Sequence, residues 1–204
     1  MNFNTQDLMG LPWSYGVVFL GYLVGSFPTA YLVGRWGAGV DIRTVGSRNM
    51  GATNVFRVVG RAAGFFTLFV DIAKGYLVVM LALWCFGGGV WPLLTGVAAV
   101  AGHTWSVWVR FRGGKGVATS AGVFLALLPG PMGAGVLAFL VAFLFTRRVS
   151  VGSILGAIVL PLSAWFLHKP LPLVGVAVVL SAVVIGRHVP NIKRLLRGEE
   201  PAVF

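Results

Sequence analysis

The sequence has few charged residues and very few acids. Only 10% of its 204 residues are charged, with five Asp and Glu against 16 Lys and Arg. An ordinary soluble domain carries about 25% charged residues, so this composition argues against a water-soluble enzyme. Five scattered acids also argue against a magnesium or calcium site built from protein ligands alone. The single cysteine, Cys85, has no partner within the chain, which excludes a disulfide framework.

Apolar residues are abundant instead. They make up 57% of the sequence, the mean hydropathy is +0.89, and they are spread along the chain, which excludes disorder. We therefore predict an all-α polytopic integral membrane protein with a single transmembrane domain over residues 1–204. A spanning helix needs about 20 mostly apolar residues. The candidate spans are seven segments, at about 13–35, 62–86, 90–109, 117–128, 133–146, 151–167 and 171–186.

The fourth and fifth candidates are short, with Pro129, Gly130 and Pro131 between them. Proline and glycine together are a strong break in a helical pattern. The segment 117–146 is therefore two short helices, one re-entrant pair, or two helices extended by neighbouring residues.

Basic residues fall almost entirely on one predicted side. Fourteen of the 16 lie in the connections after spans one, three and five and in the C-terminal tail, whereas Lys169 is on the opposite side and Lys74 is inside a span. The positive-inside rule then places the N-terminus outside and the C-terminus in the cytoplasm, which requires an odd number of spans. Seven spans satisfy this, as do five if residues 117–146 form a pair that does not cross. No basic residue precedes the first segment, so we expect a retained span rather than a signal peptide.

The first of three polar strings on the inner side runs over residues 45–57. It contains Ser47, Asn49 and Arg57 among small residues. Glycines let backbone N–H groups approach a ligand, and the arginine fork suits a phosphate. A helix cap would use only one or two such residues, so the string favours a binding site.

The second string, residues 110–119, has Gly113, Gly114 and Gly116 around Lys115, just before an expected helix. Helix N-termini and glycine-rich backbone bind phosphate through free N–H groups. It is not a nucleotide-triphosphate loop, because that motif needs Ser or Thr directly after the lysine. A flexible hairpin with topogenic charge is the alternative, but it leaves the glycines unexplained.

The third string, residues 186–200, contains His188 and Asn191, which share a face if the helix continues. Pro190 could begin a new helix. His188 is a candidate general base, because its ordinary pKa is near 6.5, or a hydrogen-bond donor to phosphate. Residues 192–200 fit an amphipathic interfacial tail. Ser150, on the same side, either joins the site or only starts a helix.

Asp71 and Lys74 lie at positions i and i+3 within the second candidate span. Ionisable residues inside a membrane are costly and usually paired or functional. We interpret them as a structural pair that helps to orient the first loop. The three histidines do not form a metal pattern, so no metal site is predicted.

The three polar strings lie on one side of the membrane and are rich in Gly, Arg, Lys, Ser and Asn. This composition indicates a site for ligands that carry phosphate. Enzymes that acylate glycerolipids from acyl-CoA place an Asp five residues after a catalytic His. In this sequence the residue five positions after His103 is Trp108, and the residue five positions after His188 is Lys193. An acyltransferase of this kind needs a donor that is already activated. An anion transporter is the alternative, but it would be expected to show an internal repeat, and the three strings are unlike one another. A purely structural membrane subunit leaves the glycine–lysine loop unexplained.

The strings resemble the three motifs of the PlsY family, bacterial acyl-phosphate:glycerol-3-phosphate acyltransferases. The similarity covers nearly the whole chain, in the same order and spacing, with one departure at Ser106, where the family often has proline. The matching pieces are Gly46-Ser47 with Asn49 and residues 51–54; Gly102-His103 with residues 111–119; and Arg187-His188 with Asn191-Ile192 and Arg194-Leu195.

This resemblance implies transfer of a fatty acyl group from acyl phosphate to the 1-hydroxyl of glycerol 3-phosphate, giving lysophosphatidic acid and phosphate. It implies a seven-helix enzyme of the bacterial inner membrane with a cytoplasm-facing site, acting first in phospholipid synthesis. The expected partners are the two substrates, membrane lipid and an upstream enzyme that makes acyl phosphate; no nucleic acid and no cofactor are expected. The hydroxyl proton passes to His188 or to the substrate's own phosphate. The predicted catalytic residues are His188, Lys115 and Ser47, and the predicted substrate-binding residues are Asn49, Arg57, Gly113, Gly114, Gly116, Ser150 and Asn191.

Overall fold

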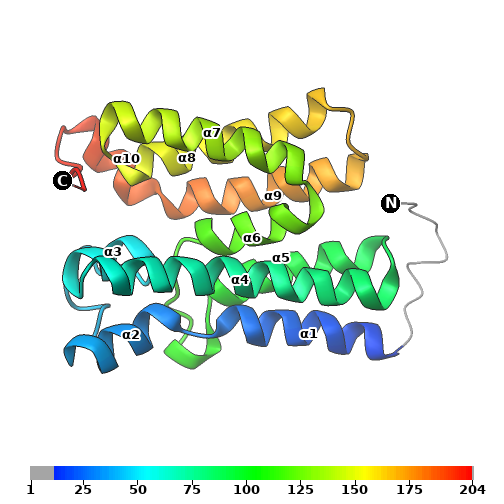
Figure 1. Ribbon diagram of the computed structural model, residues 1–204, viewed down its shortest axis with the longest axis horizontal. Helices are drawn as coiled ribbons and strands as arrows, with labels where there is room; N and C mark the ends of the chain where they lie inside the picture. Colours follow the sequence, from blue (N-terminus) through cyan, green and yellow to red (C-terminus); the bar gives the residue numbers. More distant parts are fainter. Residues whose placement is uncertain (1–11, 204) are drawn as a thin grey trace. The chain divides into compact units, whose positions relative to one another are not determined.

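The computed structural model describes residues 12–203, which form ten α-helices (Figure 1). Four helical stretches in this part of the chain are long and apolar enough to cross a membrane: Pro12–Ala38, Arg61–Phe86, Pro129–Thr146 and Val149–Phe166. A fifth is possible if the pair Leu171–Arg187 and Val189–Leu196, bent by 55°, is one span. The residues before Pro12, on which the expectation of a retained first span depends, lie outside the described residues.

The first compact unit, residues 1–127, is built around two long helical tracts. Helices α1 (Pro12–Ser26) and α2 (Thr29–Ala38) follow one another and break at Pro28, which cannot donate a helical hydrogen bond. Helix α1 packs on α5 (Val90–Thr104), and the long helix α4 (Arg61–Phe86) packs on α6 (Val117–Leu127) and on the short helix α3 (Ala52–Val58), as Figure 1 shows.

Glycines permit the close approaches within this unit. A Cβ at Gly25 would collide with the Ala99 backbone of α5, and a Cβ at Gly75 would collide with the Thr119 backbone of α6. Small residues at such positions let membrane helices approach closely. The glycine content is thus used for packing as well as for loops.

The second compact unit, residues 128–204, contains three long helices. Helix α7 (Pro129–Thr146) packs on α8 (Val149–Phe166), and α8 packs on α9 (Leu171–Arg187) (Figure 1). Helix α10 (Val189–Leu196) follows α9 and has Pro190 in its first turn, as predicted. Polar residues near the start of α8 and along α10 lie together with the C-terminal tail.

The structure corrects two of the predicted segment boundaries. The segment 90–109 is not one helix: α5 ends at Thr104, and a single 3₁₀ turn (Val107–Val109) follows. The proline–glycine break at 129–131 does not separate two helices by a loop, because α7 already begins at Pro129. A proline is well tolerated in the first helical turn, where its missing N–H has no partner to lose.

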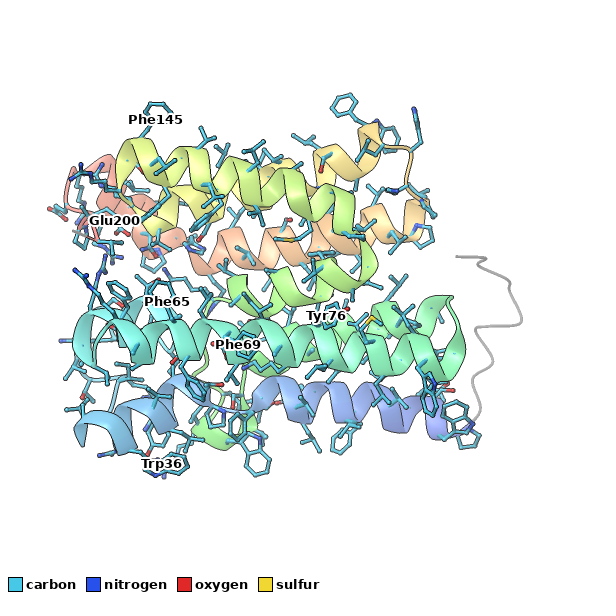
Figure 2. All side chains as sticks on the ribbon, viewed as in Figure 1. Trp36, Phe65, Phe69, Tyr76, Phe145 and Glu200 are labelled. Atoms are coloured by element: carbon cyan, nitrogen blue, oxygen red, sulfur yellow. The ribbon has the colours of Figure 1, made fainter. Side chains whose placement is uncertain are left out.

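Large apolar side chains project from the helices of both units. Trp36 and Phe69 of the first unit are 81% and 70% exposed, and Phe145 of the second is 87% exposed (Figure 2). Such a density of exposed apolar side chains is unusual for a soluble protein and is expected for helices whose outer faces contact lipid. The structure is therefore that of an all-α protein with membrane-spanning helices.

Candidate active site

The first predicted string folds around a buried amide, Asn54 of α3. Its Nδ2 atom donates to the backbone carbonyls of Ile42, Val45 and Asn49 at 3.0 to 3.1 Å, and its Oδ1 atom accepts from the N–H of Ser47 at 2.9 Å. Asn54 is only 1% exposed. One neutral side chain therefore holds a loop whose own backbone groups have no helix or sheet to pair with.

This arrangement presents the predicted ligand-binding side chains at the surface of the loop. Ser47 and Arg57 are exposed and Asn49 is half-buried. Gly46 has a positive φ of 59°, and a Cβ there would collide with the Asn54 amide. The loop thus needs glycine at position 46, and its two predicted hydrogen-bonding side chains and its cation remain accessible to a ligand.

The glycine loop of the second string rests on the end of α5. The N–H of Gly113 donates to the carbonyl of Thr104 at 3.1 Å, and the N–H of Gly114 donates to the carbonyl of His103 at 3.0 Å. Both glycines are buried, whereas Lys115 is only half-buried. A Cβ at Gly113 would collide with the carbonyl of His103, so the close seating of this loop depends on glycine.

The first and second strings meet at Gly114. A Cβ on this residue would collide with the His103 imidazole and would lie 2.5 Å from the carbonyl oxygen of Met50, in the first string. Gly116, with a positive φ of 85°, leads directly into α6. The structure therefore brings together two of the three predicted strings, at the start of a helix whose dipole favours anions.

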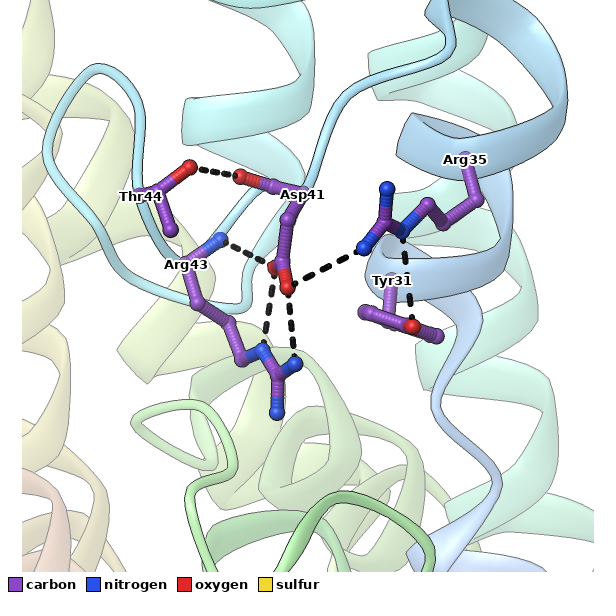
Figure 3. Close-up of polar contacts among 5 residues, drawn as sticks. All are labelled: Tyr31, Arg35, Asp41, Arg43 and Thr44. Carbon is purple, nitrogen blue, oxygen red and sulfur yellow. Dashed lines mark hydrogen bonds and ion pairs between the residues drawn. The ribbon is translucent and has the colours of Figure 1, made fainter.

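An ion cluster flanks the first string (Figure 3). Arg43 makes a bidentate contact with Asp41, with Nε to Oδ1 at 2.9 Å and Nη2 to Oδ2 at 2.7 Å, and its guanidinium lies over the Tyr31 ring. Arg35 is 3.7 Å from the same carboxylate. The hydrogen bond from Arg43 lowers the pKa of Asp41 from 3.8 to about 2. This acid is thus paired with two arginines, Arg35 of α2 and Arg43 of the loop.

The intramembrane pair is confirmed: Lys74 Nζ lies 2.8 Å from Asp71 Oδ1, and both side chains are buried. Asp71 also accepts from the Thr29 hydroxyl at 3.1 Å, and Lys74 donates to the carbonyl of Phe27 at 3.1 Å. The pair thus joins α4 to the break between α1 and α2.

In the second unit, two predicted substrate-binding residues converge on a glutamate. Ser150 Oγ donates to Glu200 Oε1 at 2.7 Å, Asn191 Nδ2 donates to the same oxygen at 2.6 Å, and Arg194 Nε donates to Oε2 at 2.7 Å. Burial raises the pKa of Glu200, but the hydrogen bonds from Asn191, Ser150 and Arg194 and the charge of Arg194 together leave it below its ordinary value. The carboxylate is therefore ionised and gathers all three donors.

The interpretation of residues 192–200 as one amphipathic tail is wrong at its end. Helix α10 stops at Leu196, and Gly198, with a positive φ of 72°, turns the chain back so that Glu200 is only 7% exposed. Sequence reasoning missed Glu200 because a charged residue near a terminus usually lies in solvent. The glycine just past the helix was the available signal for a return of the chain.

His188 lies at the junction of α9 and α10 and is 2% exposed. Its Nδ1 atom is 2.8 Å from the carbonyl oxygen of Val184. Because a carbonyl can only accept, Nδ1 carries the hydrogen in this contact, and the second ring nitrogen, Nε2, is the acceptor of the neutral ring. The tautomer thus follows from one backbone contact. Among the described residues, no three His, Cys, Asp or Glu side chains are grouped to hold a metal ion.

Comparison with known proteins identifies the family to which this chain belongs. Residues 15–198 match the family model described as glycerol-3-phosphate acyltransferase. The chain belongs to this family. It is 46% identical over 188 residues to glycerol-3-phosphate acyltransferase 2 of Moorella thermoacetica, covering 92% of this chain and 96% of the relative. It is 43% identical over 183 residues to the glycerol-3-phosphate acyltransferase of Endomicrobium trichonymphae, covering 90% and 92%.

Two solved structures of PlsY, an integral membrane glycerol 3-phosphate acyltransferase, are similar to this member of the family. The glycerol 3-phosphate form has a TM-score of 0.89 at 38% identity and covers 93% of this chain and 94% of its own. The lysophosphatidic acid form has a TM-score of 0.86 at 37% identity, with the same coverage. The predicted PlsY family membership is confirmed, and the chain is a multi-pass integral membrane acyltransferase of phospholipid synthesis.

Proposed function

We propose that this acyltransferase uses acyl phosphate as its donor and the 1-hydroxyl of glycerol 3-phosphate as its acceptor, releasing lysophosphatidic acid and phosphate. One observation carries the proposal. The first unit contains two differently built loops, one around Asn54 and one seated on His103 and Thr104, which meet where Gly114 approaches Met50. Two anion-binding loops suit a reaction in which both substrates bear phosphate.

The roles within these loops follow from their chemistry. Ser47 and Asn49 offer neutral hydrogen bonds, and Arg57 offers a fixed charge with a planar fork. Gly113, Gly114 and Gly116 bring backbone N–H groups towards a second phosphate, and Lys115 supplies its countercharge. The acyl phosphate is a mixed anhydride with a good leaving group, so positioning and charge stabilisation can carry much of the catalysis.

In the reaction step the 1-hydroxyl oxygen attacks the acyl carbonyl carbon. A new ester C–O bond forms, the bond between the acyl carbon and the phosphate oxygen breaks, and phosphate departs with the electron pair. His188 and Asn191, with Ser150, orient glycerol 3-phosphate in this proposal. The hydroxyl proton has two candidate acceptors, Nε2 of His188 and a phosphate oxygen of the substrate. If His188 is the base, His188→Gln abolishes turnover; if the substrate phosphate is the base, only the KM rises.

The donor is tested with purified protein in detergent. Glycerol 3-phosphate is supplied with palmitoyl phosphate or, separately, with palmitoyl-CoA, and lysophosphatidic acid and free phosphate are measured. We expect equimolar products from palmitoyl phosphate only. Activity with palmitoyl-CoA alone overturns the donor, and no transfer from either donor by folded protein overturns the proposed reaction.

Matched variants test the glycine loop. Lys115→Ala should lower kcat/KM by at least about 100-fold, because it removes a charge-assisted contact made by a phosphate. Lys169→Ala removes an exposed lysine on the predicted outer side and should change activity less than twofold. Equal effects of the two substitutions would show that Lys115 contributes only general positive charge.

We also propose one domain over residues 1–204, seven spans with the N-terminus outside, and a place in the bacterial cytoplasmic membrane. Fourteen basic residues on the predicted inner side support this orientation. In a Cys85→Ala background, Lys169→Cys and Gly130→Cys should react with an impermeant maleimide on intact cells, and Arg110→Cys only after permeabilisation. A protected Gly130→Cys would instead support five spans. An enzyme class that makes acyl phosphate must act upstream of such a protein.

A further inference from the structure

A small cavity is bordered by residues of both loops of the first unit. Its volume is about 10 Å³, room for roughly one water molecule. It is lined by Met50 of the first string and Gly114 of the glycine loop, and also by Asp71, Lys74 and His103. The intramembrane ion pair and both proposed phosphate-binding loops therefore border the same small space.

The ion pair anchors one side of this cavity. Asp71 Oδ1 accepts from Lys74 at 2.8 Å and from Thr29 at 3.1 Å, and Lys74 Nζ donates to the carbonyl of Phe27 at 3.1 Å. Thr29 begins α2, and Phe27 lies in the break before it. Two charges of one helix therefore hold the backbone at the break between α1 and α2.

The same carboxylate also borders the support of the glycine loop. His103 Nδ1 lies 3.8 Å from Asp71 Oδ1, too long for a hydrogen bond but close enough for the two side chains to be in contact. The backbone carbonyl of His103 accepts the N–H of Gly114, and the His103 ring is the group that a Cβ on Gly114 would strike. A displacement of His103 therefore moves the surface on which the loop rests.

We propose that Asp71, together with Lys74, is a positioning residue for the glycine loop, acting through His103. This inference rests on the proposed function, because it assumes that residues 113–116 bind a phosphorylated substrate. The pair does not touch substrate. It holds the His103 end of α5 and the start of α2 in one geometry, and Gly114 keeps its N–H direction because that geometry is rigid.

A buried ion pair can also be purely structural, and the variants separate the two roles. Asp71→Asn leaves Lys74 buried without its carboxylate, which is strongly destabilising. The double variant Asp71→Asn/Lys74→Met removes both charges, and replacing a complete buried pair by neutral groups is often nearly neutral for stability. The double variant therefore restores the fold while leaving the contacts at Thr29, Phe27 and His103 altered.

The experiment compares the double variant with Gly114→Ala and with Thr67→Val. Thr67 is a buried polar residue of the same helix whose hydroxyl donates only to the carbonyl of Ala63, so it is a matched control outside the network. Melting temperature, kcat and the KM of each substrate are measured. We expect the double variant to melt close to wild type and to raise about tenfold the KM of the same substrate whose KM Gly114→Ala raises. Thr67→Val should leave both KM values unchanged.

Hydrogen exchange supplies a readout that does not need activity. The Gly114 N–H, bonded to His103, should exchange about tenfold faster in the double variant and at the wild-type rate in Thr67→Val. Wild-type KM values and wild-type exchange in a stable double variant would overturn the positioning role. Inactive wild-type protein would contradict the proposed reaction. The exchange rate of the Gly114 N–H in the double variant, compared with wild type, would still decide whether Asp71 positions the loop.

Discussion

The two polar regions of this acyltransferase are organised by opposite means. In the first unit, a neutral amide, Asn54, makes four hydrogen bonds to backbone, and the cation Arg57 remains exposed. In the second unit, an ionised acid, Glu200, gathers the side chains of Ser150, Asn191 and Arg194. A neutral scaffold fixes the backbone of its loop without adding a charge, whereas an acidic scaffold orients polar side chains by accepting their hydrogen bonds.

The largest effect on the first unit is expected at Asn54. Asn54→Ala removes four hydrogen bonds from a side chain that is 1% exposed. At about 1 kcal/mol for each bond, the loop loses about 4 kcal/mol. We expect acyl transfer to fall below detection while α-helical content by circular dichroism changes little. Near-normal activity would show that the loop holds its shape without this amide.

Asn49→Ala is the matched control for that experiment. Asn49 is half-buried, lies in the same loop, and contributes its carbonyl to Asn54, which alanine retains. Its substitution should weaken substrate binding through the lost side chain and should leave protease resistance of the loop unchanged. Resistance lost equally in both variants would contradict a special role for Asn54.

Gly114 offers the next largest effect, because it is where the two loops of the first unit meet. Gly114→Ala forces a Cβ against the His103 ring and the Met50 carbonyl. We expect kcat/KM to fall about 100-fold, equivalent to about 2.7 kcal/mol. Gly175→Ala is the control, since a Cβ there meets no atom within 4 Å, and it should be active. Steady-state kinetics with each substrate varied in turn measures both.

Glu200 tests the acidic scaffold of the second unit. Glu200→Ala leaves three donors without their acceptor and should lower the free energy of unfolding by about 2 kcal/mol, a value reduced because Arg194 is 38% exposed. Thermal unfolding in detergent measures the loss. Glu199→Ala is the neighbouring control, because Glu199 is exposed. If both substitutions cost the same, Glu200 has no organising role.

Sequence alone located the polar strings but not what holds them. Ser47, Lys115 and His188 lie in strings whose composition is unusual for an inside loop, so they could be found by pattern. Asn54 and Glu200 could not, because their importance comes from burial and from partners up to 50 residues away. The end of α5 at Thr104 was missed for a related reason: apolar residues continue to Val109, whereas in the structure the carbonyls of Thr104 and His103 accept from Gly113 and Gly114 instead of from a further helical turn.

The smallest effect is expected at Asp41, which tests how much an ion pair contributes to the first unit. It is an acid of the first unit, but its partners are the exposed Arg35 and the half-buried Arg43 rather than substrate-binding side chains (Figure 3). Asp41→Asn should therefore cost only about 0.5 kcal/mol near pH 7 and leave the KM of both substrates within twofold. Because folding lowers the pKa of Asp41 from 3.8 to about 2, its contribution is complete above the unfolded value and is lost as pH falls through the folded value.

The difference in melting temperature between wild type and Asp41→Asn should accordingly stay constant from about pH 7 to about pH 5 and shrink below about pH 4. Glu200→Gln should behave alike, because the pKa of Glu200 is also lowered from its ordinary 4.5, but its difference should be larger between about pH 5 and about pH 7. A larger effect for Asp41 would mean that its ion pairs with Arg35 and Arg43, rather than the neutral amide, organise the first loop. The first unit would then be organised by an acid, as the second unit is, and the contrast between the two units would be wrong.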